Sequence, residues 1–467
     1  MKPARVSGAG AARLARVAAA ALGAIAAVVA LVCAAALPAA AAPTAEQLAR
    51  LGTDLTPVGA ERAGNADGSI PAWTGGLPAK PIDEATGYAD PFAGDKILFT
   101  ISAANAKAYR DKLSPGQLAL LALYPETFRM NVYPTRRSAA WPAAVLDEVK
   151  KQAPLARTDG DRLLDVGKSA VPFPIPDEAR QLMWNHVLRW RGGSVNRTFT
   201  WFPVAANGRF FTVRVNDYFA FDQQGFMNES RPNRLFNLRG TYLSPAAIEG
   251  QMTLVWEPID PVAHSRDTWA FDTRWSRVRR LPSLSHDDVD PRTQGMRVSD
   301  QYDGWNGAPD RYDWKIAGKR EMYIQYNAYK LSDKTLRYSD IIQPGHPRPE
   351  LLRYELHRVW VVEASLRPGA RHRYPKRTFY LDEDTWQVVG EDAYNAAGQL
   401  WRVGDHATMQ FYDVMVPWYR ATMHYDLLAR SYLISFLDNE ERQPWRFGWI
   451  GDRVDFLPSN LRRLGTR

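Results

Sequence analysis

The residues best suited to chemistry in this chain are Glu355 and His357, two positions apart in the run "YELHRVWVVEASL". Alternate residues of a strand point to the same face, so the carboxylate could orient the imidazole as a general base. The same spacing is typical of an ion pair on the water-exposed face of a sheet. We expect the surface pair and assign no catalytic residue, and the base stays open as the alternative.

Candidate metal ligands cluster in one segment, "SDQYDGWNGAPDRYDW", which contains Asp300, Asp303, Asp310 and Asp313 among turn residues. Calcium binds several oxygen ligands from one short loop, and aspartates could supply them. The spacing does not match an EF-hand, however, and aspartate is a common turn former. None of the eight histidines lies three or four residues from another. We therefore predict no metal site and no cofactor, with calcium as the alternative.

The common motifs of hydrolases, metalloproteases and nucleotide-binding proteins are missing from the sequence. The glycine-rich stretch "NADGSIPAWTGG", residues 65–76, has no predicted strand before it and no predicted helix directly after it. It therefore cannot direct backbone amides at a phosphate. We expect Asp67 and Gly68 to form a turn and Trp73 to anchor the segment on the body of the fold.

The first residues predict export. Lys2, Arg5, Arg13 and Arg16 precede the run "VAAAALGAIAAVVALVCAAAL" and the small residues "PAAAAP", a pattern typical of a signal peptide. We expect it to cover residues 1–42, with cleavage before Ala41 or Ala42. An uncleaved anchor is the alternative, but the run is rich in alanine and ends at small residues. With these four basic residues removed, the formal net charge falls from +8 to +4, a balance that does not indicate a nucleic-acid partner.

The single cysteine, Cys33, lies inside the apolar run and directly follows the bulky Val32. A lipid-anchored cysteine would follow a small residue at the start of the mature chain, so we predict a protein without a lipid anchor. The mature chain then has no thiol. This excludes disulfides, cysteine nucleophiles and metal sites with cysteine ligands.

Two regions differ in composition after the signal. Residues 43–175 are rich in proline and glycine and contain three short predicted helices, "SAANAKAYRDKL", "SPGQLALLALYP" and "AAVLDEVKKQ". We expect this region to wrap over a larger body because helices this short are not stable alone. Residues 176–467 begin with an amphipathic helix, "PDEARQLMWNHVLRWRGG", whose apolar face carries Leu182, Met183, His186, Val187 and Trp190.

Alternation of apolar and polar residues then predicts a series of strands. They are expected in "RFFTVRVNDYFAF", "TLVWEPI", the hairpin "DTWAFDTRWSRVRRLP", "YELHRVWVVEASL", "RHRYPKRTFYLD", "WQVVGEDAYN" and "LWRVGDHATMQFYD". Long strands with one apolar side are typical of a curved antiparallel sheet with one wet face. The fold class is therefore mainly β with some α.

Several long motifs resemble a large bacterial family that is catalogued as outer-membrane lipoprotein-sorting-protein-like. They include "LTPVGAERAGNADGSIPAWTGGL", "YPETFRMNVYPTRRSAAWP", "WNHVLRWRGGSV", "NGAPDRYDWK" and "LDEDTWQVVGEDAYNAAGQLWRV". The resemblance implies the fold of the lipoprotein carriers LolA and LolB, which is an incomplete antiparallel barrel with helices covering its concave face. Residues 43–175 would form an extension over that domain.

The resemblance also implies a function and a place. It points to the periplasm of a Gram-negative bacterium, with outer-membrane or other peripheral membrane association open. Partners would be a hydrophobic or lipid-like ligand, an RND-type exporter and an outer-membrane barrel protein. We expect a non-enzymatic carrier or chaperone. The alternatives are an assembly factor of an envelope complex, or a hydrolase acting on a hydrophobic or glycan substrate.

A cavity for that ligand is expected between the amphipathic helix and the concave face of the sheet. Met183, Val187 and Trp190 would form the helix wall, because methionine and tryptophan adapt to ligands of variable shape. The strands would supply Trp256, Trp269, Trp360 and Phe379 to the facing wall.

Overall fold

The structure is a computed structural model that describes residues 42–83, 86–221, 233–282, 284, 286–443, 445–448 and 451–465. The predicted signal peptide lies outside these residues except for Ala42, and so does Cys33. No helix within the described ranges combines the length and the apolar composition needed to cross a bilayer.

Most of the described chain belongs to one large sheet. In sequence order, its strands are β1 (Phe99–Ile101), β2 (Met130–Val132), β5 (Ser194–Val204), β6 (Val213–Ala220), β7 (Phe236–Ser244), β8 (Met252–Glu257), β9 (Asp267–Asp272), β10 (Arg277–Leu281), β11 (Tyr312–Gln325), β12 (Tyr354–Leu366), β13 (Lys376–Asp382), β14 (Val388–Tyr394), β15 (Leu400–Phe411), β16 (Val416–Asp426), β17 (Ser431–Leu437) and β18 (Arg446–Phe447). A separate hairpin pairs β3 (Arg157–Asp159) with β4 (Arg162–Leu164).

Helices are short and few by comparison. The α-helices are α2 (Ala45–Ala49), α3 (Pro115–Leu123), α4 (Ala143–Gln152), α5 (Ala179–Leu188), α6 (Tyr338–Ile341) and α7 (Leu461–Gly465). The 3-10 helices are η1 (Ala106–Lys112), η2 (Pro291–Thr293), η3 (Ser299–Gln301), η4 (Pro309–Arg311), η5 (Tyr329–Ser332), η6 (Pro349–Leu351), η7 (Arg453–Phe456) and η8 (Pro458–Asn460).

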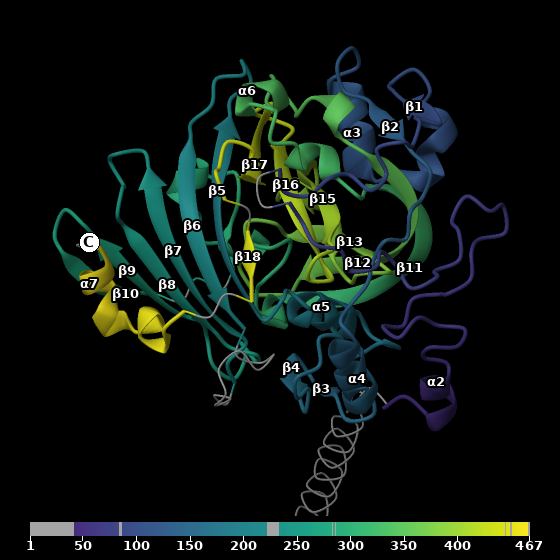
Figure 1. Ribbon diagram of the computed structural model, residues 1–467, viewed down its shortest axis with the longest axis horizontal. Coiled ribbons are helices and arrows are strands. Elements are labelled where there is room, and N and C mark those ends of the chain that lie inside the picture. Colours follow the sequence, from purple (N-terminus) through teal and green to yellow (C-terminus); the bar gives the residue numbers. More distant parts are fainter. Residues whose placement is uncertain are drawn as a thin grey trace, which may run out of the picture. The chain divides into compact units, whose positions relative to one another are not determined.

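The sheet is strongly curved and stays open. Its strand order runs β1-β2-β12-β13-β14-β15-β16-β17-β5-β6-β7-β8-β9-β10, with β11 on β12 and β18 on β5. Neighbours are antiparallel except for β2 and β12, which meet in parallel. Figure 1 shows β5 to β10 as one wing, β11 to β17 as the other, and α5 at the lower end of the curve between them. The predicted fold class, a mainly β protein built on a large incomplete barrel, is confirmed.

Local sequence signals agree with many of these elements. The predicted hairpin is the antiparallel pair β9 and β10, and the predicted strands after residue 350 are β12 to β15. Ser114 caps α3 as expected, since its hydroxyl accepts the backbone N–H of Gln117 and Pro115 takes the first helical position. These features depend on neighbours in sequence, which is why composition and periodicity predict them.

The expected wet face of the sheet is wrong for its central strands. Every residue of β16 is buried, and β14 and β15 are buried over most of their length. Residues 43–175 cover the outer face there. Gly116 of α3 lies so close to Val403 and Asp392 that a side chain would collide with them, and Leu120 and Leu121 join one apolar cluster with Val403. Burial on both faces leaves the central strands without a polar side.

Helix α5 also differs from expectation, because it is buried on all sides except at Arg180. The Asn185 side chain exchanges hydrogen bonds of 2.9 and 2.7 Å with the backbone of Phe173. On another side, His186 lies between the backbone of Trp386 and that of Asp303. The predicted amphipathic helix is therefore a packed core element, since chain from both regions of the sequence surrounds it.

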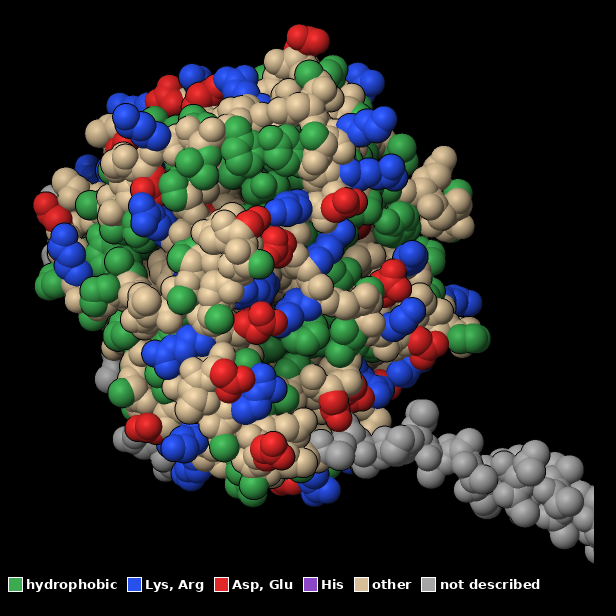
Figure 2. Space-filling model, turned by 90° about the vertical axis from the view of Figure 1, so that its right-hand side faces the viewer, with side chains coloured by type: hydrophobic (Ala, Val, Ile, Leu, Met, Phe, Trp, Pro, Cys, Tyr) green, Lys and Arg blue, Asp and Glu red, His purple; other side chains and the backbone are tan. Residues whose placement is uncertain are grey.

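The surface on the side of β11 and the N-terminal region has mixed character. Figure 2 shows basic and acidic side chains interspersed over this face, with an apolar patch near its upper edge. This face therefore carries no extended field of a single sign.

Candidate functional site

One pocket of the described chain, about 350 Å³ in volume, lies between strands β6 to β9 and residues 281, 282, 284 and 286–306, which we call the covering segment. The sheet side of the pocket consists of alternate residues along each strand, which therefore share one face. They are Val215 and Asp217 of β6, Phe236, Leu238, Gly240 and Tyr242 of β7, Thr253, Val255 and Glu257 of β8, and Thr268 and Ala270 of β9.

Most of the pocket wall is apolar or aromatic. Trp201 of β5, Phe236 and Tyr242 provide broad aromatic surfaces on the sheet side. The covering segment adds Val298 and Tyr302 on the opposite side. Walls of this kind fit a hydrocarbon ligand, because they remove its surface from water without requiring matched polar groups.

The covering segment is tied to the sheet at both ends by Arg266. This buried guanidinium donates to the Glu257 carboxylate at 2.5 Å, to the Asn306 carbonyl at 2.6 Å and to the Leu284 carbonyl. One side chain on the turn between β8 and β9 thus fixes both ends of the segment. Charge-assisted hydrogen bonds of this kind are stronger than neutral ones.

Two aspartates hold the middle of the same region against the core. Asp300 accepts from Arg377 at 2.6 Å and contacts His372 at 3.0 Å. Asp303 pairs with Arg189 at 2.8 Å and Arg191 at 2.6 Å, the residues that follow α5. In spite of burial, the guanidinium charges lower the pKa of Asp303 to about 2.

The calcium alternative has no support in this arrangement. Asp300 pairs with Arg377 and His372 through one oxygen, Oδ2, and Asp303 pairs with two guanidinium groups. Asp310 faces His286, and Asp313 pairs with Arg367 at 3.0 Å. Across the described residues, these four aspartates do not form a group whose oxygens could share one ion.

Charged groups around the pocket are almost all paired. Asp217 lies 3.4 Å from Arg197 and accepts from the Tyr302 hydroxyl at 2.7 Å. Burial raises the pKa of Asp217, although Arg197 and the tyrosine hydroxyl oppose the rise. Glu257 pairs with Arg266, and Asp290 lies 3.5 Å from Arg292 at the rim.

Arg297 is the buried exception among them. It lines the pocket and is only 4% exposed, yet it has neither an ion pair nor a hydrogen bond to any residue in the described ranges. Its guanidinium carbon lies 4.9 Å from the ring centre of Trp201 and 5.0 Å from that of Tyr302. The cation is thus packed between two aromatic rings without a carboxylate of its own.

None of the seven side chains predicted to bind ligand lines this pocket. Met183 and Val187 of α5, with Phe379, are buried in the central apolar cluster, and Trp190 and Trp360 pack against it. Trp256 and Trp269 have the opposite strand parity to the pocket residues. The centres of their rings are 4.6 Å apart, and both rings pack beside Phe456. Their role in ligand binding stays a prediction.

The pocket residues could have been found only in part from the sequence. The alternation of Phe236, Leu238, Gly240 and Tyr242 in "FNLRGTY" indicates a strand with one apolar face. No local pattern marks Arg297 or Arg266, because their importance comes from contacts with strands distant in sequence.

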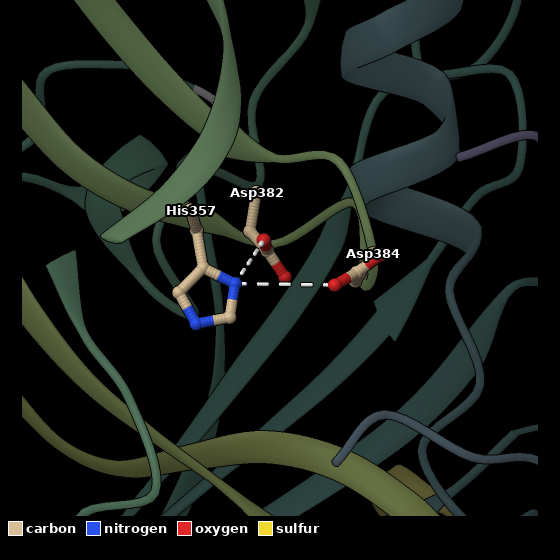
Figure 3. Close-up of side chains that lie close together, drawn as sticks. All are labelled: His357, Asp382 and Asp384. Carbon is tan, nitrogen blue, oxygen red and sulfur yellow. Dashed lines mark ion pairs between the residues drawn. The ribbon is translucent and has the colours of Figure 1, made fainter. Parts of the chain in front are cut away.

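The Glu355 and His357 pair is buried, so the predicted surface pair is wrong. The two residues are 0% and 1% exposed, and the imidazole Nε2 lies 3.3 Å from the carboxylate. Figure 3 shows the other ring nitrogen, Nδ1, facing Asp382 at 3.8 Å and Asp384 at 3.9 Å. Glu355 and His357 belong to β12, Asp382 ends the adjacent strand β13, and Asp384 lies in the turn that follows it.

The charged groups of this cluster shift the pKa values of His357 and Asp382. Burial opposes the charged form of His357, but the hydrogen bond with Glu355 and the charges of Asp382 and Asp384 outweigh it and raise the pKa of the imidazole. Burial, with the Asp384 charge, raises the pKa of Asp382 to about 7. Arg353 donates to Glu355 at 2.6 Å and balances that carboxylate.

His357, Asp382 and Asp384 form the group within the described residues whose ligand atoms could share a metal ion. Asp382 offers an oxygen, Oδ1, that has no hydrogen-bond partner there. Both oxygens of Asp384 already accept from Arg137, at 3.0 and 2.6 Å. Arg137 and Arg353 thus supply the cations for Asp384 and Glu355, and Arg353 also pairs with Asp95 at 2.7 Å.

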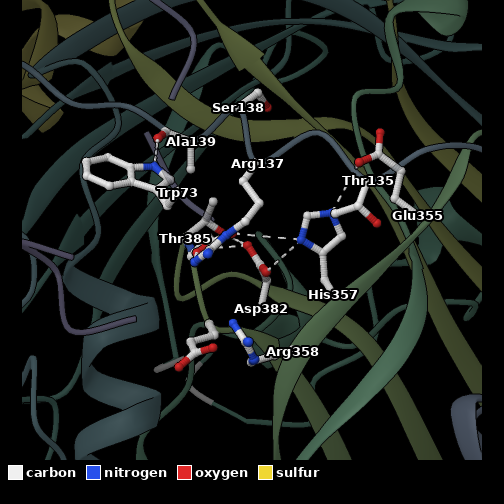
Figure 4. Close-up of polar contacts among 12 residues, drawn as sticks. Trp73, Thr135, Arg137, Ser138, Ala139, Glu355, His357, Arg358, Asp382 and Thr385 are labelled. Carbon is white, nitrogen blue, oxygen red and sulfur yellow. Dashed lines mark hydrogen bonds and ion pairs between the residues drawn. The ribbon is translucent and has the colours of Figure 1, made fainter. Parts of the chain in front are cut away.

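The same cluster holds the N-terminal region in place. Arg137, 7% exposed, also donates to the carbonyls of Glu61 at 2.7 Å, Arg62 at 3.1 Å and Pro71 at 3.3 Å. Figure 4 shows Arg137, His357 and Asp382 close together, with Trp73 beside Ala139. The carboxylate that accepts from Arg137 is that of Asp384. The Trp73 indole donates to the Ala139 carbonyl at 3.0 Å, and Gly68 makes the expected turn with a φ of 75°.

Comparison with known proteins identifies a family. The family described as protein of unknown function (DUF1329) matches residues 100–462. An uncharacterized protein of Pseudomonas aeruginosa is 45% identical over 434 residues, which cover 91% of this chain and 95% of that protein.

Solved structures show weaker likeness. A DUF1329 family protein from Desulfovibrio piger is 13% identical, with 61% of this chain and 100% of that chain covered and a TM-score of 0.42. A LolA superfamily protein from Nitrosomonas europaea is 14% identical, with 60% and 100% covered and a TM-score of 0.35.

Proposed function

The chain belongs to the DUF1329 family, and from this premise we propose that it is a non-enzymatic periplasmic carrier or chaperone for a lipid-like molecule. The ligand would lie in the pocket between β6 to β9 and the covering segment. The observation that carries this proposal is the pocket itself, about 350 Å³ in volume with mostly apolar and aromatic walls.

The construction of the pocket supports carriage more than catalysis. A carrier needs a cavity that shields a hydrocarbon chain and a cover that can release it. Here Arg266 holds both ends of the cover, Asp300 and Asp303 hold its middle, and the cover is separate in sequence from the strands β6 to β9 below it. Local contacts of that kind can break without unfolding the sheet.

An enzyme acting through Glu355 and His357 is less well supported. Both side chains are buried and neither belongs to the residues that line the pocket. A base must come within hydrogen-bond reach of its substrate, and here the pair instead contacts the groups that hold the N-terminal region.

The partners that we propose are those that the family resemblance implies. We propose an exported protein that works with an RND-type exporter or an outer-membrane barrel protein and passes on its ligand there. The predicted signal peptide and the predicted absence of a lipid anchor agree with free movement between the two membranes.

Titration with a fluorescent fatty acid tests the proposal. Ala270 of β9 faces the pocket, so Ala270→Trp should fill it and weaken probe binding about tenfold or more, the equivalent of roughly 1.4 kcal/mol. Ala263→Trp, on the exposed turn between β8 and β9, is the matched control and should bind like the wild type.

Two results would count against the carrier. Equal binding by wild type and Ala270→Trp would place the probe elsewhere. If the wild type binds no hydrophobic probe at all, the assembly-factor alternative becomes the better account.

A further inference from the structure

We propose that the pocket selects an amphiphile with an anionic head group, and that Arg297 is the residue that binds this head. The inference deepens the proposed function and rests on it. The ligand class is a hydrocarbon chain ending in a carboxylate or a phosphate.

The first argument is a count of charges at the pocket. Four carboxylates line it, on Asp217, Glu257, Asp288 and Asp290, and three guanidinium groups, on Arg266, Arg292 and Arg297. Arg266 is taken by Glu257, Arg292 lies beside Asp290, and Asp217 has Arg197 behind it.

After that pairing, one charge of each sign remains. The remaining acid, Asp288, is exposed to solvent, where a free charge costs little. The remaining cation, Arg297, is 4% exposed and has no ion pair or hydrogen bond with the residues that the structure describes.

The second argument is the cost of leaving such a cation alone. A guanidinium has five N–H donors and stays charged at all physiological pH values. Burying it without acceptors is unfavourable unless another group satisfies it. The rings of Trp201 and Tyr302, 4.9 and 5.0 Å from its guanidinium carbon, offset part of the cost. They accept no strong hydrogen bonds, so donors stay available to a ligand in the pocket.

The third argument concerns Asp217, a carboxylate of the pocket that could pair with Arg297 in place of a ligand. Its Oδ2 already accepts the Tyr302 hydroxyl at 2.7 Å and lies 3.4 Å from Arg197. Burial raises the pKa of Asp217, while the charges of Arg197 and Arg297 oppose the rise. Asp217 therefore does not take the place of a ligand oxyanion at Arg297.

Geometry then orients the ligand. The aromatic and aliphatic walls provided by Phe236, Leu238, Tyr242 and Val255 surround the chain, and the head group meets the fixed guanidinium. The planar fork of arginine matches a carboxylate or a phosphate with two parallel hydrogen bonds. Because Arg297 is packed between two rings, little side-chain freedom is lost when the head group binds.

Head-group selectivity of the wild-type protein is the direct test. Four probes with the same chain length are compared below their critical micelle concentrations by displacement of a fluorescent fatty acid: dodecanoate, monododecyl phosphate, dodecanol and dodecyltrimethylammonium. We expect one or both anions to bind about tenfold tighter than dodecanol, and the cation to bind more weakly than dodecanol. The two anions show whether a carboxylate or a phosphate is preferred.

Substitution of the arginine completes the test. Arg297→Met keeps a long apolar side chain and should abolish the preference for anions while dodecanol binding stays within about twofold. Arg279→Met removes the same charge from an exposed position on β10 and should keep the preference. Circular dichroism and thermal unfolding establish that both variants are folded.

The outcomes separate the two proposals. Equal affinity of the wild type for dodecanol and both anions, or a preference for anions that survives in Arg297→Met, overturns the role of Arg297 and leaves the carrier intact. If none of the four probes binds the wild type, the carrier proposal fails and the head-group inference fails with it. The wild-type comparison holds even if Arg297→Met does not fold.

Discussion

Two buried arginines show how context decides the role of one residue type. Arg137 is surrounded by acceptors, with Asp384 and three backbone carbonyls at 2.6 to 3.3 Å. The Arg297 side chain is buried to a similar degree, but it lies against the rings of Trp201 and Tyr302 and has no hydrogen bond or ion pair within the described residues. The first arginine is satisfied by the fold and holds it together. The second is left with donors that the fold does not use, as expected of a ligand-binding group.

Substitution of Arg137 should therefore lower the free energy of unfolding. Arg137→Met leaves the buried Asp384 carboxylate without its cation and frees the carbonyls of Glu61, Arg62 and Pro71. Breaking one partner of a buried pair costs on the order of 3–5 kcal/mol, so we expect a loss of that size in the free energy of unfolding, measured with urea. Limited proteolysis should also cut the region before residue 100 faster.

The adjacent residue is the matched control. Arg136 pairs with Asp95, but its side chain is 47% exposed, and exposed pairs contribute about 1 kcal/mol or less. Arg136→Met should thus change stability little. Equal losses in the two variants would mean that Arg137 is not the anchor we describe.

The elements around the site were predicted with uneven success, for physical reasons. Strands such as β9, β10 and β12 to β15 follow from alternation, which is encoded in neighbouring residues. The burial of α5 and the burial of β16 on both faces do not, because much of the chain that covers them is remote in sequence. The backbone groups that hold His186, at Asp303 and Trp386, are more than a hundred residues away from it. The covering segment carries no regular period, so its position over β6 to β9 depends on Arg266, Asp300 and Asp303, whose partners are remote.

The covering segment should loosen when its tether is weakened. Arg266→Lys keeps a cation beside Glu257, but one nitrogen on a straight side chain cannot also bond the carbonyls of Leu284 and Asn306. We expect the fluorescent fatty acid to dissociate about tenfold faster, as for the loss of one charge-assisted hydrogen bond, in stopped-flow displacement.

Arg280 provides the comparison for that experiment. It is exposed and pairs with Asp267 on the neighbouring strand, so Arg280→Lys should leave the dissociation rate unchanged. An unchanged rate in Arg266→Lys would show that the cover does not control release.

At the scale of the described chain, the N-terminal region and the sheet form one compact unit from residue 42 to the C-terminus. Residues 43–175 add β1 and β2 beside β12 and cover the outer face of the central strands. The opposite wing, β6 to β10, is left with a hollow that the covering segment closes only in part. The extension also reaches the other wing, where Arg162 pairs with Asp260 on the turn between β8 and β9 at 2.9 Å.

The fold class could be predicted from the sequence, but the position of the pocket could not. The aromatic residues that we predicted as ligand walls were chosen for type and helical or strand spacing. Strand parity turns Trp256 and Trp269 away from the pocket, and α5 has no free face. Which face of a sheet stays open is decided by segments that pack from elsewhere, and no local pattern records that choice.

The central claim is that the pocket carries a ligand in the cell. Native mass spectrometry of the protein purified from its own periplasm, beside Ala270→Trp prepared in the same way, tests it most directly. We predict that the wild type retains a bound mass that dissociates as an anionic amphiphile and that the filled variant has lost it. Wild type and variant that both appear only at the bare polypeptide mass, or that both keep the same bound mass, would contradict the account.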